Sequence, residues 1–78
     1  APAASAGRLL PHNLEAEESL LGAMLLSRDA VSVGLEKVTA EHFYKPAHGH
    51  VFGAINTLSG RGQAIDAVTV AELIAERR

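Results

Sequence analysis

Four histidines are the residues of this sequence best suited to bind a metal ion, but their spacing does not favour a shared site. His48 and His50 lie two positions apart on a predicted helix, so their side chains point about 160° apart. His12 and His42 are far away in the sequence, and the chain has no cysteine that could complete a zinc site. We therefore predict no metal-binding residue. His48 is expected at the apolar edge of its helix, satisfied by a hydrogen bond, and His50 is expected in solvent.

Glu17 is the acidic residue in the most unusual position, because it falls inside the apolar face of a predicted helix. A carboxylate there must be paired or hydrogen-bonded, or its pKa rises and it becomes neutral. One interpretation is a general acid or base. The interpretation we favour is a structural anchor that accepts from backbone N–H groups or pairs with a cation such as Arg8 or Lys45.

Two further patterns resemble parts of enzyme sites but have simpler explanations. Asp66 and Thr69 have the spacing of a helix cap, and no histidine lies near them in the sequence. Gly60 and Gly62 are not followed by the GK[ST] ending of a phosphate-binding loop. We therefore predict no catalytic residue, no cofactor-binding residue and no cofactor for this chain.

The charge balance argues against DNA binding as the main role. Seven Lys and Arg residues stand against nine Asp and Glu residues, giving a net charge of −2 with no basic block, whereas a domain that grips phosphates usually has a positive face. Phe43 and Tyr44 could stack on bases, but without interleaved cations we expect them in or near the core. A small helical nucleic-acid-binding domain remains the alternative function. The longest strongly apolar run, residues 20–26, is far shorter than the roughly 20 residues that span a bilayer.

The length and composition fit one small globular domain. The chain has 78 residues, of which 47% are hydrophobic and 21% are charged, an ordinary balance for a globular fold. Residues 1–12 begin with a small, uncharged, alanine-rich stretch and are expected to form a flexible N-terminal arm. Residues 13–78 carry the apolar periodicity that predicts helices and should form the folded unit.

The first predicted helix, near residues 14–27, should be the central one. Asn13 is a good N-cap residue placed just before it. Its apolar side chains cover an arc of about 200°, twice what a surface helix needs. They are Leu14, Ala16, Leu20, Leu21, Ala23, Met24 and Leu25. Such a helix must pack on at least two sides, so replacing Leu21 with Ala should cost about 2–5 kcal/mol.

The later segments predict three more helices and a turn. They are a shorter helix from residue 30 to about 38, a helical turn over 39–44, a long helix over 46–60 and a last helix from 67 onward. Asp29 and Asp66 are the expected N-caps of the second and last helices, and Pro46 suits the first position of the long one. Because the last helix meets no stop signal, we expect the fold to be truncated at its C-terminal end.

The fold class predicted from these elements is all-α. We expect a small compact orthogonal bundle of four main helices plus a short helical turn. The residues predicted to anchor it structurally are Asn13, Glu17, Leu21, Phe43, Phe52 and Asp66.

Three segments, in order, carry a family resemblance that spans about residues 8–78. The run LPHNLEAEESLLGAML over residues 10–25 closely resembles the start of bacterial replicative DNA helicases of the DnaB type. Residues 43–48, FYKPAH, resemble the "DFY…PAH" segment of that family, with His42 where the family often has an acidic residue. Residues 62–69, GQAIDAVT, resemble its "G-x-x-[IV]-D-x-[VI]-T" entry to a helix.

The resemblance implies a non-catalytic part of a bacterial, cytoplasmic motor. In that family an N-terminal helical domain forms a collar on a hexameric ring, and its head continues into a helical hairpin used for pairing. The collar also presents a surface to primase within the primosome. A separate C-terminal domain uses ATP and Mg²⁺, contacts DNA and unwinds the duplex, and its catalytic residues have no counterparts here.

Assembly and partner docking are therefore the function that the resemblance implies for this chain. Its contacts would depend on buried apolar area and shape. Two residues are candidates for partner contact: Leu26, which projects from the polar side of the first helix, and Ile65, on the link before the last helix.

Overall fold

The computed structural model describes residues 13–77. The predicted arm over residues 1–12, including Arg8 and His12, lies outside the described residues, as does Arg78.

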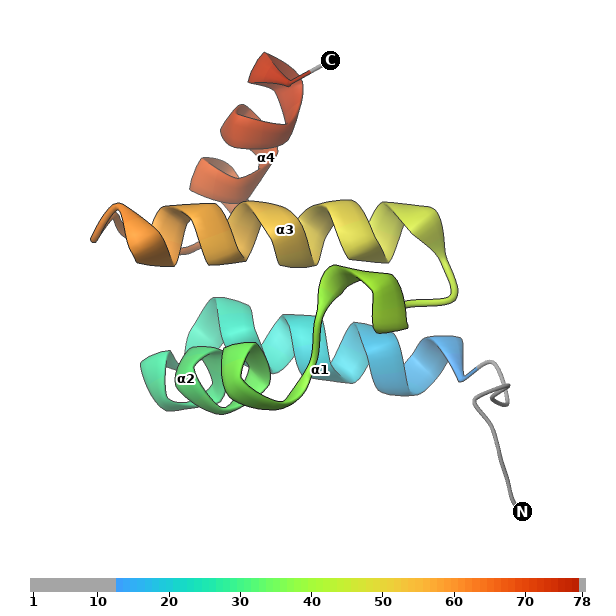
Figure 1. Ribbon diagram of the computed structural model, residues 1–78. Helices are drawn as coiled ribbons and strands as arrows, with labels where there is room; N and C mark the ends of the chain where they lie inside the picture. The colour runs from blue at the N-terminus through green and yellow to red at the C-terminus, as the bar shows by residue number, and fades with distance from the viewer. Residues whose placement is uncertain (1–12, 78) are drawn as a thin grey trace.

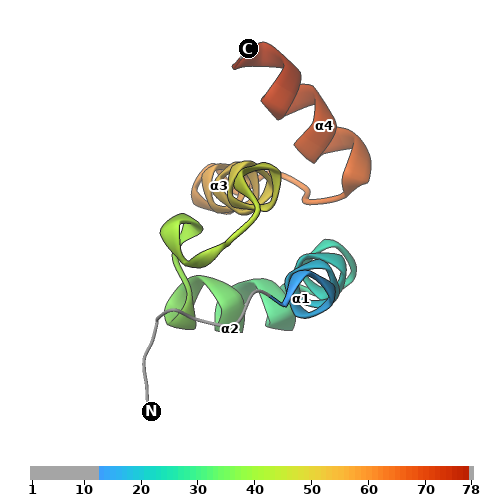
Figure 2. The ribbon, with the colours of Figure 1, turned by 90° about the vertical axis from the view of Figure 1, so that its right-hand side faces the viewer.

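Five helical segments make up the described chain, and residues 13–77 contain no strand. In order they are α1 (Leu14–Leu26), α2 (Arg28–Lys37), the short 3-10 helix η2 (Ala40–His42), α3 (Pro46–Gly60) and α4 (Ala67–Glu76). In both views α1 and α3 run side by side along nearly the same direction, while α2 and α4 cross them steeply (Figures 1 and 2). The predicted all-α bundle is confirmed.

Side chains at the helix starts satisfy backbone N–H groups that a helix leaves unpaired. The Asn13 side chain accepts from the Ala16 N–H at 2.9 Å at the start of α1. At the start of α4, the Asp66 carboxylate accepts from the Thr69 N–H at 2.8 Å, while the Thr69 hydroxyl accepts from the Asp66 N–H at 3.0 Å. Pro46 occupies the first turn of α3, where its missing N–H removes no helical bond.

Ser27 alone connects α1 to α2, which corrects the expected cap of the second helix. Its N–H donates to the Ala23 carbonyl at 2.9 Å and closes α1. Its hydroxyl accepts from the Ala30 N–H at 3.3 Å and opens α2. Asp29 lies inside the first turn of α2 instead of capping it. The extended backbone of Ser27 turns the chain within one residue, so α2 begins at Arg28, earlier than predicted.

The central helix is α3, and the expectation that α1 would be central is wrong. In α1 only Leu21 and Met24 are buried, and Leu14 and the alanines of its apolar arc are exposed. α3 contacts α1, α2, η2 and α4. It buries five side chains: His48, Phe52, Ala54, Ile55 and Leu58. Each alanine counts toward the width of an apolar arc but offers little apolar area to bury. The arc of α1 therefore predicted more burial than the helix has.

The core is one cluster to which all four α-helices contribute. Its buried members are Leu21, Met24, Val31, Phe43, Phe52, Ala54, Ile55, Leu58, Val70 and Leu73. The rings of Phe43 and Phe52 pack with centroids 5.2 Å apart and tilted by 42°, which attaches the end of the η2 turn to α3. Among residues 13–77, none of the helices combines the length and the apolar character needed to span a bilayer.

Two glycines permit close approach between elements. A Cβ atom on Gly49 of α3 would lie 3.0 Å from the carbonyl oxygen of Ala40 in η2. A Cβ atom on Gly34 of α2 would lie 2.9 Å from the sulfur of Met24, which is buried in α1. Glycine is a weaker helix former than alanine. At Gly34, however, the missing side chain lets α2 pack closely against Met24 of α1.

Candidate functional site

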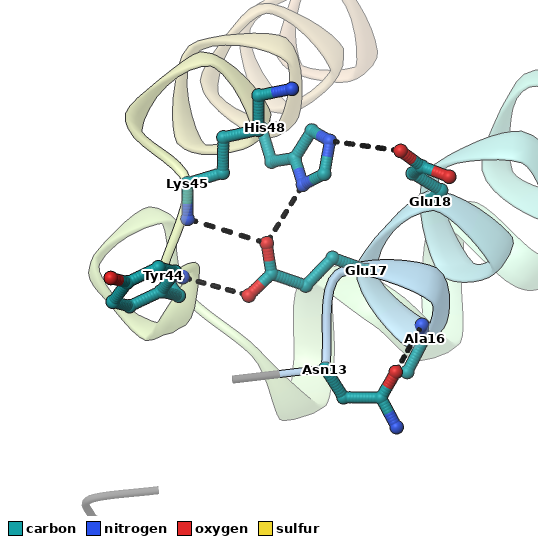
Figure 3. Close-up of polar contacts among 7 residues, drawn as sticks. All are labelled: Asn13, Ala16, Glu17, Glu18, Tyr44, Lys45 and His48. Atoms are coloured by element: carbon teal, nitrogen blue, oxygen red, sulfur yellow. Dashed lines mark hydrogen bonds and ion pairs between the residues drawn. The ribbon is translucent and has the colours of Figure 1, made fainter. Parts of the chain in front are cut away.

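The carboxylate of Glu17 joins α1 to the start of α3 (Figure 3). One oxygen accepts from the Tyr44 backbone N–H at 2.7 Å. The other lies 2.7 Å from Nδ1 of His48 and 3.5 Å from the Lys45 backbone N–H. These partners come from the turn after η2 and from the first turn of α3, which begins at Pro46 and approaches η2 closely at Gly49.

The electrostatics of Glu17 favour its ionised form. Burial of the side chain, which is 14% exposed, tends to raise its pKa. The hydrogen bonds from His48, Tyr44 and Lys45, together with the attraction of the His48 ring, outweigh that effect. The pKa of Glu17 therefore lies below its ordinary value.

His48 is the buried partner in this arrangement. An ionised carboxylate can only accept hydrogen bonds, so Nδ1 of His48 carries the proton that points to Glu17. Nε2 lies 3.9 Å from the carboxylate of Glu18, which is 65% exposed. The sequence-based expectation that His48 lies at the core margin, satisfied by a hydrogen bond, is confirmed, and His50 is exposed.

Glu17 is held as a structural link in this geometry. Of the partners considered from the sequence, Lys45 contributes its backbone N–H, and Arg8 lies outside the described residues. A carboxyl group whose pKa is held low is a poor proton donor near neutral pH. Within residues 13–77, no three His, Asp or Glu side chains gather as potential metal ligands.

The other residues predicted as structural anchors occupy two kinds of position. Leu21, Phe43 and Phe52 are buried in the core. Asn13 and Asp66 lie at the surface, where they cap α1 and α4.

The two candidate contact residues, Leu26 and Ile65, line the same groove. This groove, which we call groove 1, has a volume of about 460 Å³ between the α1–α2 corner and the link from α3 to α4. Leu26 is 90% exposed, whereas Ile65 packs partly against the core. Sequence reasoning missed the other apolar residues of groove 1, such as Leu25 and Val31, because nothing local indicates that the link lies beside the corner.

A second groove adjoins the first. Groove 2 has a volume of about 340 Å³ and lies between the C-terminal end of α3 and one side of α4. Gln63 and Ala64 line both grooves. Groove 2 could not be predicted from the sequence, because its walls come from separate helices and the apolar periodicity does not determine how those helices cross.

The folded unit matches a known family along nearly its whole length. The family model described as DnaB-like helicase N terminal domain matches residues 9–78. The chain belongs to this family.

Relatives support the assignment to the DnaB family. The chain is 49% identical to the replicative DNA helicase DnaB of Mycobacterium leprae over 76 residues, which are 97% of this chain and 13% of that helicase. It is 44% identical to the replicative DNA helicase DnaB of Treponema pallidum over 66 residues, which are 85% of this chain and 15% of that protein. The chain therefore spans only a small part of these relatives.

A solved structure of the DnaB family shares the fold. The crystal structure of the N-terminal domain of DnaB helicase from Mycobacterium tuberculosis is 51% identical and superposes with a TM-score of 0.83. The match covers 86% of this chain and 46% of that chain.

Two of the DnaB-like sequence segments meet at Glu17. The segment over residues 10–25 supplies Glu17, and the segment over 43–48 supplies Tyr44, Lys45 and His48. The resemblance between sequences therefore corresponds to a physical contact in this domain.

Proposed function

We propose that this chain is a non-catalytic assembly and partner-docking domain of a hexameric replicative DNA helicase. The observation that carries the proposal is the match of residues 9–78 to the DnaB-like helicase N terminal domain. The relatives named above are replicative DNA helicases, and this chain corresponds to 13–15% of their length. In the proposal the domain contributes to a collar on the ring and offers a surface to primase in the bacterial cytoplasm.

In this proposal, a different domain carries out the chemistry of DNA unwinding. ATP and Mg²⁺ would act in a C-terminal motor domain, which would also make the main contacts with DNA. Glu17 and His48 already bond to each other, and Glu17 also accepts from a backbone N–H. Their role is to hold the domain in shape, and residues 13–78 serve as the helical head of the collar.

Groove 1 is the surface we assign to partner contact. Leu26 is 90% exposed beside it and Ile65 lines it. A large exposed apolar side chain next to a groove that Leu25 and Val31 help to line gains binding free energy when a partner covers both.

Binding to the primase of the source bacterium tests the docking role. The 78-residue chain should bind primase in isothermal titration calorimetry, and Leu26→Ser should weaken that binding at least about tenfold. Val33→Ser is the matched control, because Val33 is exposed on α2 but lines neither groove. The chain alone should hydrolyse no ATP. Hydrolysis, or the absence of both primase binding and self-association, would overturn the proposal.

A salt titration of DNA binding separates this function from the nucleic-acid-binding alternative. With a net charge of −2, the chain should bind DNA weakly at physiological salt. Micromolar or tighter binding with a steep salt dependence would favour the alternative.

A further inference from the structure

The short turn η2 positions a buried aromatic ring. Phe43, which follows η2, is buried and packs on Phe52 of α3, and its N–H donates to the Ala40 carbonyl at 3.3 Å. η2 itself packs on α3 (Figure 1). It does so closely enough that a Cβ atom on Gly49 would lie 3.0 Å from the Ala40 oxygen. The position of Phe43 therefore depends on whether this turn keeps its shape.

A histidine ring closes η2 at its start. The Thr39 N–H donates to Nδ1 of His42 at 3.1 Å. A ring nitrogen accepts only while it is unprotonated, so the neutral His42 ring carries its proton on Nε2. A glutamine at this third position of a helical turn could accept the same bond at every pH. Histidine can accept it only until Nδ1 takes up a proton.

His48, farther along the same segment, uses its ring in the opposite way. Its Nδ1 already carries a proton and donates it to Glu17 at 2.7 Å. A second proton would enter at Nε2, which lies 3.9 Å from the carboxylate of Glu18. Glu17 stays ionised at about pH 5, because its pKa lies below the ordinary value of 4.5. Mild acid therefore leaves the bond between Glu17 and His48 in place.

No carboxylate close to His42 offsets the loss of its bond to Thr39. Within residues 13–77, His42 makes no ion pair, and Glu17 and Glu18 of α1 face His48 instead. The charged and titratable side chains at the end of α2, on η2 and at the start of α3 are Glu36, Lys37, Glu41, Lys45, His48 and His50. None of them is bonded to the His42 ring in the described chain. A proton on His42 therefore gains no close ionic partner in exchange for the bond that it breaks.

We propose that His42 makes η2 a proton-sensitive turn, in which a proton from solvent occupies Nδ1, breaks the bond from Thr39 and loosens the turn on α3. Histidine is the side chain whose charge changes between about pH 8 and pH 5. His42 is exposed, so solvent protons reach its ring. Because Glu17 keeps its bonds to Tyr44 and His48, the change is confined to residues 39–43.

Nitrogen-15 NMR of the imidazole rings tests the starting state without any substitution. At about pH 8, His42 of the 78-residue chain should have an unprotonated Nδ1 and a protonated Nε2. His48 should show the reverse arrangement. A His42 ring that carries its proton on Nδ1 at this pH would overturn the proposal.

The backbone amide protons report the release of the turn. From about pH 8 to pH 5, the amide proton of Thr39 should move upfield as it loses its acceptor, and that of Phe43 should move with it. The amide proton of Tyr44, which is bonded to Glu17, should move much less. A Tyr44 amide proton that moves as far as that of Thr39 would show that the Glu17 link opens too, and would overturn the confined release.

Three substitutions assign the response to His42. His42→Gln should hold the Thr39 amide proton near one position throughout, because an amide oxygen accepts at every pH. His42→Lys should give, already at about pH 8, the position that the original chain reaches in acid, because lysine is charged and has no acceptor. His50→Gln is the matched control, since His50 is exposed on α3, and it should respond to pH like the original chain.

Urea unfolding of the same variants gives a second readout. Between about pH 8 and pH 5, the unfolding equilibrium constant of the original chain should rise about threefold to tenfold more than that of His42→Gln, because one capping bond is lost. A pH response that persists undiminished in His42→Gln would place the sensitive group elsewhere and overturn the proposal. The inference is independent of docking, so a failure to bind primase would leave it standing.

Discussion

Among single residues, Glu17 joins two segments that are far apart in the sequence. Its carboxylate on α1 accepts from Tyr44 and Lys45 and contacts His48, which lie 27, 28 and 31 residues later. Loss of that acceptor would leave two backbone N–H groups and a buried imidazole without their partner. The packing of α1 against the first turn of α3 should therefore depend on this one side chain.

Replacing Glu17 with Gln should lower the free energy of unfolding by about 1–3 kcal/mol, because a neutral amide accepts weaker hydrogen bonds than a carboxylate. Thermal or urea unfolding measures the change. Glu18→Gln is the control, because that carboxylate is 65% exposed and 3.9 Å from His48. It should change stability by less than about 1 kcal/mol. An unchanged melting temperature for Glu17→Gln would contradict the anchoring role.

The same substitution should alter the pH dependence of stability. The pKa of Glu17 is lower in the folded chain than its ordinary value of 4.5, so the unfolded chain binds the proton first as the pH falls. Its stabilisation is fully present above the ordinary pKa and is lost as the pH falls through the lower folded pKa. The stability gap between the original chain and Glu17→Gln should therefore be constant from about pH 8 to pH 6 and shrink towards about pH 3. Urea unfolding across this range measures the gap, and a gap that persists undiminished at the acid end would be inconsistent with the low pKa.

Leu21 and Leu26 form a matched pair of leucines on one helix. Leu21 is buried and Leu26 is 90% exposed. Leu21→Ala should therefore cost about 2–5 kcal/mol through lost contacts and a cavity. Leu26→Ala should change the free energy of unfolding by less than about 0.5 kcal/mol. Chemical unfolding of the two variants distinguishes them, and equal effects would show that Leu26 is covered in the folded chain.

For single residues, the sequence indicates that a side chain must be hydrogen-bonded but does not identify its partner. The position of Glu17 in an apolar arc predicts that its carboxylate is hydrogen-bonded, and the spacing of Asp66 and Thr69 predicts a cap, because both depend on neighbours within one helix. That Tyr44 and His48 are the partners of Glu17 depends on how distant segments cross, and local spacing carries no information about that crossing.

At the scale of elements, the connections decide which helix becomes central. Ser27 joins α1 to α2 without a loop, so α2 crosses α1 at once. α3 then lies against both, and η2 and α4 pack on it as well. The number and limits of the helices follow closely from periodicity and caps. The central role of α3 could not be predicted in this way, because the width of an apolar arc depends on the number of apolar residues and not on the area that each one buries.

Two glycines of α3 provide a paired test of element packing. Gly53→Ala should raise the free energy of unfolding by up to about 1 kcal/mol, because alanine favours helix and nothing lies within 4 Å of the added methyl group. Gly49→Ala should lower it, because its methyl group would lie 3.0 Å from the Ala40 carbonyl oxygen. That backbone is held by the bond from the Thr39 N–H to the His42 ring. Melting temperatures of the two variants should move in opposite directions, and a gain at both sites would mean that η2 can shift freely.

In the whole molecule, α4 is the least enclosed helix. It packs chiefly on α3, through the buried Val70 and Leu73 and a 2.7 Å bond from Arg77 to Thr57. α3 is surrounded by the other elements. The all-α class could be predicted from the sequence, but groove 2 beside α4 could not, because it arises where separate helices cross.

Native-state hydrogen exchange should show that α4 opens more readily than α3. Amides of α3 near Ile55, which is fully buried, should exchange only on global unfolding. Amides in the last two turns of α4 should exchange faster, through local opening that leaves the other helices folded. Equal protection in α3 and α4 would show that α4 unfolds only with the rest.

The connection between α1 and α2 consists of Ser27 alone, so it should tolerate neither an inserted nor a deleted residue. Adding one residue there would separate the bond that closes α1 from the cap that opens α2, both of which Ser27 now supplies. Deleting it would remove both the last bond of α1 and the first cap of α2. Engineered tags, fusions or circularly permuted ends therefore have no room at this corner.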